Sequence, residues 1–183
     1  MTIDGKPAYV YFISPGQINV LAPADTASGP VAVQVTYGGA ASNVVNAAES
    51  TLSPSLFLFD PQGRKYVAAV RSDGPFIGPP NLFGTALATV PAHPGDVLLL
   101  FGTGFGPTNP ASPIGTTFGT ANPTATVTAT FGGVPATVQF AGLVAPGEYQ
   151  FNILVPNVPA GDNLVVLTVG GASTQANAYL AVQ

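Results

Sequence analysis

The chain repeats part of its own sequence, and this repeat constrains the fold more than any other feature. Three segments near the start return near the end in the same order: residues 5–12 as residues 133–140, 17–23 as 150–156, and 38–42 as 170–173. A period of about 130 residues is too long for a solenoid and is typical of two related domains. The sequence therefore predicts two copies of one structural unit.

The two copies are unequal, because only the second follows a long stretch of chain. An apolar, strand-forming segment, residues 96–105, leads into the second copy, whereas the first opens close to Met1. A sandwich that lacks its opening strands exposes sheet edges and one side of its core, so we expect something to cover it. Three covers are open: residues 52–70 of the same chain, an upstream region, or a strand from a neighbouring subunit.

A strand from a neighbour makes a head-to-tail contact, which propagates into a filament when it does not close. For this case the sequence predicts Ile3, Val10 and Phe12 as the subunit or edge contacts. Charged residues make up only 7% of the chain, so such packing meets little electrostatic repulsion.

The local patterns predict β-structure throughout. Val31, Val33 and Val35 alternate with smaller or polar residues, which is the period of a half-buried strand. The 19 prolines and 22 glycines leave no stretch long enough for a stable helix. Residues 60–63 have the composition of a type I turn, so residues 56–59 and 66–70 are expected to pair as a hairpin. Many short strands at this spacing favour a sandwich.

Residues 72–95 are rich in proline and glycine and show no sustained alternation. We interpret them as an ordered connection between two domains, residues 1–90 and residues 91–183. The first domain is then an incomplete unit with the hairpin and the connection, and the second is a complete sandwich. A single large sandwich with one extended loop is the alternative.

Composition excludes several function classes. The net charge is -4 and there is no basic patch, which argues against a nucleic-acid partner. The chain has no cysteine, so it holds neither disulfides nor a thiolate metal site. No window is apolar enough to span a membrane. The first residues read as a strand and a turn, so we expect any export signal to lie outside this chain.

Two glycine-rich motifs carry a resemblance to known families. Residues 94–107 run from a Pro-Gly turn through an apolar strand into alternating glycines around Phe105, and residues 131–136 and 153–156 match two further motifs. Together they resemble the immunoglobulin-like IPT/TIG family over about residues 90–183, and more weakly over residues 2–48. The whole chain is similar to the uncharacterised Solibacter-type C-terminal domain of secreted proteins of Acidobacteria, through residues 10–20 and 100–108.

The resemblance implies tandem immunoglobulin-like β-sandwich units and an extracellular or cell-surface setting. It carries no established activity, and no catalytic residue transfers to this sequence. The strand of residues 97–101 is expected to place alternate side chains on opposite faces. The residues predicted to fill the second sandwich are Phe105, Phe140, Phe151, Ile153 and Val166.

The residues that could carry chemistry are sparse. Residues 102–106 lack the Lys and the helix of a phosphate loop. His93, the single histidine, has no sequence-visible partner except Asp96, and no Gly-x-Ser-x-Gly elbow is present. Closely spaced carboxylates, which calcium sites require, are absent. The sequence therefore predicts no catalytic, cofactor or metal site.

Tyrosines offer a second kind of site. Tyr9 and Tyr11 lie on one expected strand, where exposed rings could stack on sugars, although the same face could be core. We therefore expect a non-enzymatic extracellular structural or adhesive module, self-assembling into a filament by strand or edge contacts. Its partners are copies of itself or another cell-surface protein. The alternative is a carbohydrate-binding accessory module of a secreted protein, with a polysaccharide as partner.

Overall fold

The computed structural model describes residues 1–23, 28–59, 65–111 and 121–183, which form strands, turns and loops and no helix. The protein is therefore all-β, as the alternation of apolar residues predicts. The strands of its first part, which we call the N-terminal repeat, are β1 (Thr2–Ile3), β2 (Lys6–Pro7), β3 (Tyr9–Ser14), β4 (Gln17–Leu21), β5 (Gly29–Gln34), β6 (Thr36–Tyr37), β7 (Ala40–Ala41) and β8 (Val45–Glu49).

An intervening segment follows, with β9 (Ser55–Leu56), β10 (Ala69–Arg71), β11 (Phe76–Ile77), β12 (Thr89–Val90), β13 (Val97–Thr103), β14 (Thr108–Asn109) and β15 (Asn122–Pro123). The last part, the C-terminal repeat, contains β16 (Val127–Phe131), β17 (Val134–Ala145), β18 (Glu148–Leu154), β19 (Gly161–Val169), β20 (Ala172–Ser173) and β21 (Tyr179–Val182).

The repeat in sequence is also a repeat in hydrogen-bonded structure. β1 pairs with β2 and β5, and β5 with β8, just as β16 pairs with β17 and β19, and β19 with β21. The hairpin β3–β4 likewise corresponds to β17–β18, and each carries a bulge at the same place. Matching partners in the two repeats include Ile3↔Val33 with Phe131↔Val165, and Val10↔Val20 with Val138↔Ile153.

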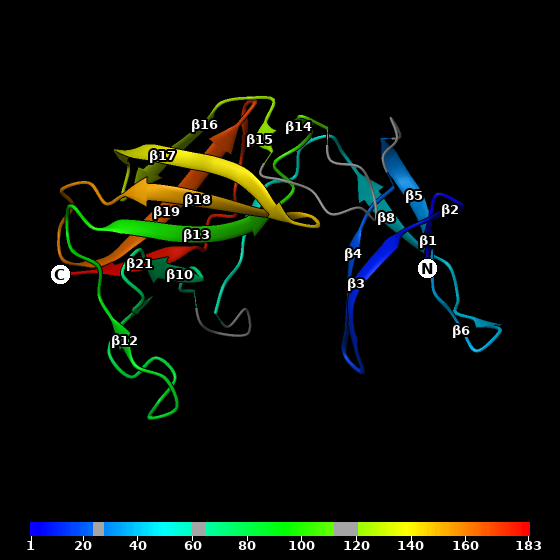
Figure 1. The fold of residues 1–183 in the computed structure, drawn as a ribbon, viewed down its shortest axis with the longest axis horizontal. Coiled ribbons are helices and arrows are strands. Elements are labelled where there is room, and N and C mark those ends of the chain that lie inside the picture. Colours follow the sequence, from blue (N-terminus) through cyan, green and yellow to red (C-terminus); the bar gives the residue numbers. More distant parts are fainter. Residues whose placement is uncertain (24–27, 60–64, 112–120) are drawn as a thin grey trace.

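The C-terminal repeat and the intervening segment form two layers, as in a β-sandwich (Figure 1). One layer runs β10–β13–β18–β17, and the other runs β17–β16–β19–β21. β17 belongs to both, because its residues 134–136 pair with β16 and its residues 137–145 with β18. The single long strand thereby ties the layers together along one side.

The core lies between these layers. β13 and β18 alternate strictly, with Leu98, Leu100, Phe151 and Ile153 fully buried, as the period of a strand predicts. Phe105 is also buried, and its ring centroid lies 4.4 Å from that of Phe151. These four strand positions and Phe105 confirm the predicted core of this part.

The prediction is wrong for two core residues. Phe140 and Val166 are only half-buried, whereas Val165 and Leu167, the neighbours of Val166, are fully buried. On β19 every second side chain faces the core, and Val166 belongs to the other set. On β17 the bulge between Val138 and Phe140 changes the phase, so that the later side chains point to the opposite face.

The glycine-rich bend at the end of β13 packs against the chain before β9. Gly104 has a φ of +77°, and a Cβ atom there would overlap the carbonyl oxygen of Ser53. Glycine is therefore required both for the backbone conformation and for the close approach. The bend turns Phe105 into the core, as expected from the sequence.

The intervening segment joins the second sandwich rather than standing apart from it. β10 and β9 both pair with β13, and the predicted hairpin forms, with Leu58 opposite Val67 and the Phe59 N–H donating to the Tyr66 carbonyl. Its turn, residues 60–63, lies outside the described residues. Strands on both sides of residue 90 share this sheet. The domain boundary near that residue stays a prediction.

Side-chain contacts of Lys65 and Tyr66 anchor this hairpin to the C-terminal repeat. Lys65 Nζ lies 2.9 Å from Asp162 Oδ2, and the Tyr66 hydroxyl donates to the same oxygen at 3.1 Å. Lys65 also lies over the Tyr179 ring, 4.5 Å from its centroid. The hydrogen bond to Asp162 raises the pKa of Lys65, and burial raises the pKa of Tyr66.

Candidate functional site

The two repeats differ at the edge of β4 that faces away from β3. In the C-terminal repeat, β18 pairs with β17 on one side and with β13 on the other. β4 occupies the corresponding place in the N-terminal repeat and pairs with β3 (Figure 1). Among the described residues, no strand pairs with the other edge of β4. The position that β13 fills in one repeat is therefore open in the other.

The described residues of the segment 52–70, one of the three expected covers, form no strand pair with the N-terminal repeat. β9 hydrogen-bonds to β13, and the Val67 N–H donates to the carbonyl oxygen of Tyr179. This segment therefore completes the C-terminal sandwich instead.

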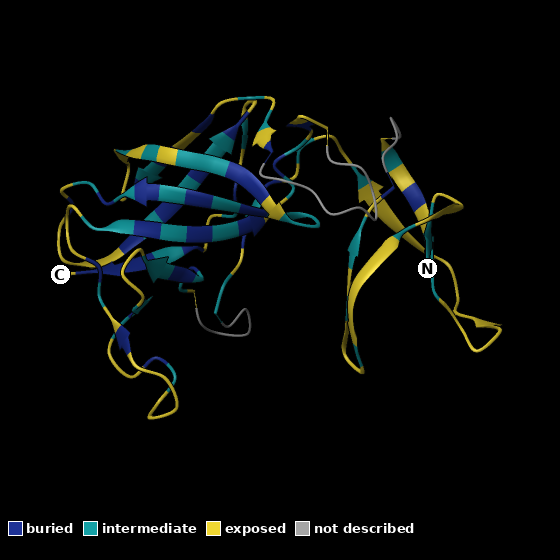
Figure 2. Cartoon of the chain, in the orientation of Figure 1, coloured by how far each residue is buried: buried dark blue, intermediate teal, exposed yellow. Residues whose placement is uncertain are grey.

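The hairpin β3–β4 is apolar and exposed. Five consecutive residues of β3 keep large exposed fractions: Tyr9 39%, Val10 40%, Tyr11 56%, Phe12 46% and Ile13 63%. Among the described residues between positions 1 and 50, only Pro23 and Val31 are buried. Figure 2 shows the resulting contrast with the buried strands of the C-terminal repeat. The N-terminal repeat has one four-stranded sheet and two two-stranded sheets, with almost no closed core among them.

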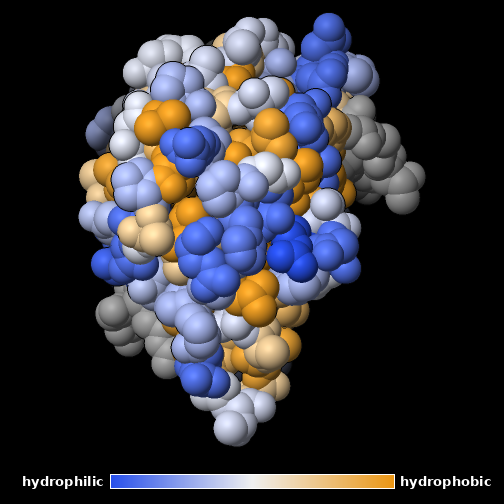
Figure 3. All heavy atoms as spheres, turned by 90° about the vertical axis from the view of Figure 1, so that its left-hand side faces the viewer, coloured by the Kyte–Doolittle hydropathy of each residue, from blue (hydrophilic) through white to orange (hydrophobic). Residues whose placement is uncertain are grey.

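The free edge of β4 carries no charge that would protect it. Residues 8–23 contain no Asp, Glu, Lys or Arg. Natural sheet edges usually avoid pairing with other chains through charged side chains, prolines or bulges. Here only the bulge on β3 serves that purpose, and β4 itself pairs regularly from Gln17 to Asn19. On the opposite end of the molecule, polar and apolar groups are intermixed (Figure 3).

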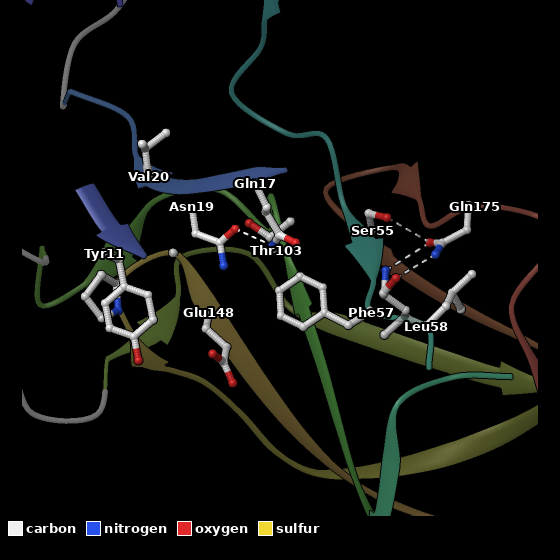
Figure 4. A pocket seen from close by; sticks show the side chains of 13 residues that line it. Tyr11, Gln17, Asn19, Val20, Ser55, Phe57, Leu58, Thr103, Glu148 and Gln175 are labelled. Carbon is white, nitrogen blue, oxygen red and sulfur yellow. Dashed lines mark hydrogen bonds between the residues drawn. The ribbon is translucent and has the colours of Figure 1, made fainter. Parts of the chain in front are cut away.

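A cleft of about 670 Å³ lies beside the hairpin, between it and the C-terminal sandwich (Figure 4). The hairpin contributes Tyr11, Gln17, Asn19 and Val20 to its lining. The opposite wall consists of residues 55–58, Thr103, residues 146–148 and Gln175. The cleft therefore combines two aromatic rings, those of Tyr11 and Phe57, with amide and carboxylate side chains.

Some of these polar groups are already paired. Gln17 Nε2 donates to Asn19 Oδ1 at 2.6 Å. The Gln175 side chain accepts from the Leu56 N–H at 2.9 Å and donates to the Leu56 carbonyl at 2.7 Å, so it serves β9 as a strand partner would. Glu148 adds a carboxylate to the lining.

Tyr149 holds the strand that begins at this wall. Its side chain is buried between the sheets, and its hydroxyl donates to the carbonyl oxygen of Gly106. Burial raises the pKa of Tyr149 to about 12, because the interior disfavours the phenolate. The phenol therefore stays neutral at physiological pH and acts as a structural anchor.

The residues predicted from the sequence fall in different places. Ile3 is half-buried on β1, whose backbone pairs on both sides with β2 and β5. Val10 and Phe12 lie on β3 on either side of its bulge, and both are exposed. Tyr11 lines the cleft, whereas Tyr9 does not.

Sequence reasoning missed Ile18 and Val20 of the open strand and Phe57 of the cleft. The first two could have been found from the repeat, because they occupy the places of the buried Phe151 and Ile153. Both are only half-buried here. Phe57 offered no signal, since its place opposite Tyr11 depends on how the two parts pack.

His93 lies away from the cleft, in the turn before β13. Its backbone N–H donates to Asp96 Oδ2 at 2.8 Å, and its ring Nδ1 is 3.7 Å from the same oxygen. Arg71 Nη1 is 3.8 Å from that carboxylate. Asp96 thus closes the turn and ties it to β10.

No family model, no curated protein and no solved structure matches this chain. Within the described ranges, no three His, Asp or Glu side chains gather as a metal ion would require. The same residues include no helix with the length and apolarity needed to cross a membrane.

Proposed function

We propose that this chain is a non-enzymatic extracellular structural or adhesive module, built of two immunoglobulin-like units, that self-assembles into a filament through strand or edge contacts. The open edge of β4 is the observation that carries this proposal. The shared register of the two repeats supports the reading that the first unit lacks the strand that the second has.

Physical reasoning favours association at this place. An isolated two-stranded hairpin is marginally stable in water, and a third strand or a packed partner is needed to hold it. The exposed run from Tyr9 to Ile13 is also the kind of contiguous apolar surface that marks a protein interface. Covering it removes apolar area from water at the same time as it pairs the free edge.

The size of the particle in solution tests the proposal. Light scattering should give a mean mass that rises with concentration above the 18.3 kDa of one chain. Amides of β3 and β4 should exchange with solvent quickly at high dilution and slowly when the protein is concentrated. β13 and β18, which are paired on both sides, serve as the internal control. A monomer at every concentration, with Ile3, Val10 and Phe12 protected even at high dilution, contradicts the proposal.

The cleft favours carbohydrate binding as a second function. Tyr11 and Phe57 offer flat apolar rings, and Asn19 and Glu148 offer hydrogen-bonding groups beside them, which is the combination that sugar rings require. In a pull-down on insoluble polysaccharides, Tyr11→Ala should lose retention. Tyr37→Ala is the matched control, because Tyr37 is 84% exposed and lies outside the cleft lining. Equal retention of both variants contradicts a sugar site at Tyr11.

A further inference from the structure

We propose that the free edge of β4 receives β3 of a second copy of this chain, so that successive hairpins form one continuous antiparallel sheet. The inference rests on the proposed function and names the partner and the contact. Three observations point to a second copy: the strand arrangement of the C-terminal repeat, the exposed strand β3, and the cleft beside β4.

The C-terminal repeat shows what the open position accepts. β13 lies antiparallel to β18, with Leu100 opposite Phe151 and Leu98 opposite Ile153. All four side chains are fully buried. Because Ile18 and Val20 take the places of Phe151 and Ile153, the strand that completes the N-terminal repeat must run antiparallel to β4 and bring apolar side chains opposite these two residues.

β13 of another folded copy cannot supply this strand. Its Leu98 and Leu100 are fully buried, and it is already paired with β10 and β18. Removing β13 from its own sheet would expose several large buried side chains and destabilise the second sandwich.

β3 has the required chemistry and is available. β13 contains five consecutive apolar residues, Val97 to Phe101, and β3 contains five, Tyr9 to Ile13. These five apolar residues of β3 are all exposed. Among the described residues, no strand pairs with the edge of β3 that faces away from β4. Since the whole run is apolar, the residues that come opposite Ile18 and Val20 are apolar in either phase of the strand.

The directions of the strands also fit. Within one copy β3 and β4 are antiparallel, so a β3 strand added to the far side of β4 continues the alternation. The donor copy then presents its own free β4 edge to a third copy. Each contact therefore joins the β3 edge of one copy to the β4 edge of the next, which is a head-to-tail contact that need not close into a ring. The cleft lined by Gln17, Asn19 and Val20 lies beside the receiving strand.

The contact should be reversible. The bulge between Val10 and Phe12 limits the regular ladder to a short stretch of β3. With no charged residue between positions 8 and 23, salt should strengthen the association or leave it unchanged rather than weaken it.

Two charge substitutions test the two edges separately. Ile18→Lys places a charge at the receiving strand, and Tyr11→Lys places one at the donating strand. Each should raise the concentration needed for half-maximal assembly by about tenfold or more, because burying an unpaired ammonium costs more than the roughly 1.4 kcal/mol that a factor of ten represents. Val44→Lys is the matched control, since Val44 is 54% exposed and lies outside the hairpin.

Mixing the two variants gives the decisive result. Each variant alone should stay monomeric where the unchanged chain assembles. A mixture should form a dimer and nothing larger, because the Tyr11→Lys chain keeps a good β4 edge and the Ile18→Lys chain keeps a good β3 edge. Sedimentation velocity distinguishes monomer, dimer and polymer, and circular dichroism melts check that both variants keep the C-terminal sandwich.

The other outcomes separate the inference from the proposed function. A dimer of the unchanged chain that Ile18→Lys abolishes and Tyr11→Lys leaves intact means that β4 pairs with β4 of its partner. This result overturns the inference and leaves association at the hairpin in place. Assembly that neither substitution affects overturns the inference and moves the contact elsewhere. A monomer at all concentrations overturns both.

Discussion

Phe151 and Ile18 occupy the same place in the two repeats, and truncating each to alanine tests the difference between a closed and an open sandwich. Phe151 is 0% exposed, and its ring packs against Phe105, with the centroids 4.4 Å apart, and against Tyr149. Ile18 is only half-buried, and no strand in the described part of the chain pairs with the other edge of its strand, β4.

The two costs should differ severalfold. Removing a buried phenylalanine side chain destabilises a protein by about 3–5 kcal/mol, through lost burial and the cavity left behind. For a chain of this size each kcal/mol lowers the melting temperature by about 2–4 °C, so Phe151→Ala should melt about 6–20 °C below the unchanged protein. Ile18→Ala leaves no closed cavity and should cost less than about 1 kcal/mol.

Thermal melts followed by far-ultraviolet circular dichroism, on samples dilute enough to be monomeric, give the comparison. Urea titrations on the same samples check that both variants unfold with a similar denaturant dependence. Equal losses at the two positions would refute the reasoning, since they would mean that Ile18 is as fully enclosed as Phe151. A Phe151→Ala melt within 1 °C of the unchanged protein would also refute it.

Three other perturbations have defined outcomes. Burial raises the pKa of Tyr149 to about 12 from the usual 10, so the stability that depends on its neutral phenol, at most about 3 kcal/mol, should be complete below pH 10 and be lost as the pH rises towards 12. Alkaline unfolding of Tyr149→Phe should therefore be less steep, with a remainder from other tyrosines. Gly104→Ala should destabilise the protein more than Gly39→Ala, because both glycines have positive φ but only the first would overlap a backbone carbonyl, and melts that coincide would contradict this close approach. Gln175→Ala should cost about 1–3 kcal/mol by leaving a β9 peptide unpaired, whereas Gln139→Ala, at an exposed position, should be neutral; a neutral Gln175→Ala would show that water replaces the amide.

Much of the local structure could be predicted because it depends on residues close in sequence. The alternation from Val97 to Phe101 placed Leu98 and Leu100 on one buried face, and the turn composition of residues 60–63 predicted the pairing of the flanking strands. The failures have local causes as well. A single extra residue in β17 reverses the phase of the side chains after it, and no property of Phe140 itself signals the bulge.

The unequal repeat predicts an incomplete first copy and names Val10 and Phe12 as subunit or edge contacts. Both residues lie on the exposed strand β3, and their role as contacts stays a prediction. Ile3 was named with them, but its strand is paired on both sides. The cleft between Tyr11 and Phe57 depends on contacts between residues far apart in the chain, which no local pattern encodes.

Apolar alternation and turn residues act over a few positions, so the sequence alone is enough to predict that this protein is all-β and to find the residues that repeat. Which strand lies beside which depends on contacts between residues far apart in the chain. Backbone hydrogen bonds are chemically alike at every residue, so they do not distinguish β18, which is covered by β13, from β4, which is not. That choice came from apolar side chains such as Leu56, Val67 and Leu100, which are buried in the core of the second sandwich, so that their strands do not cover the edge of the first.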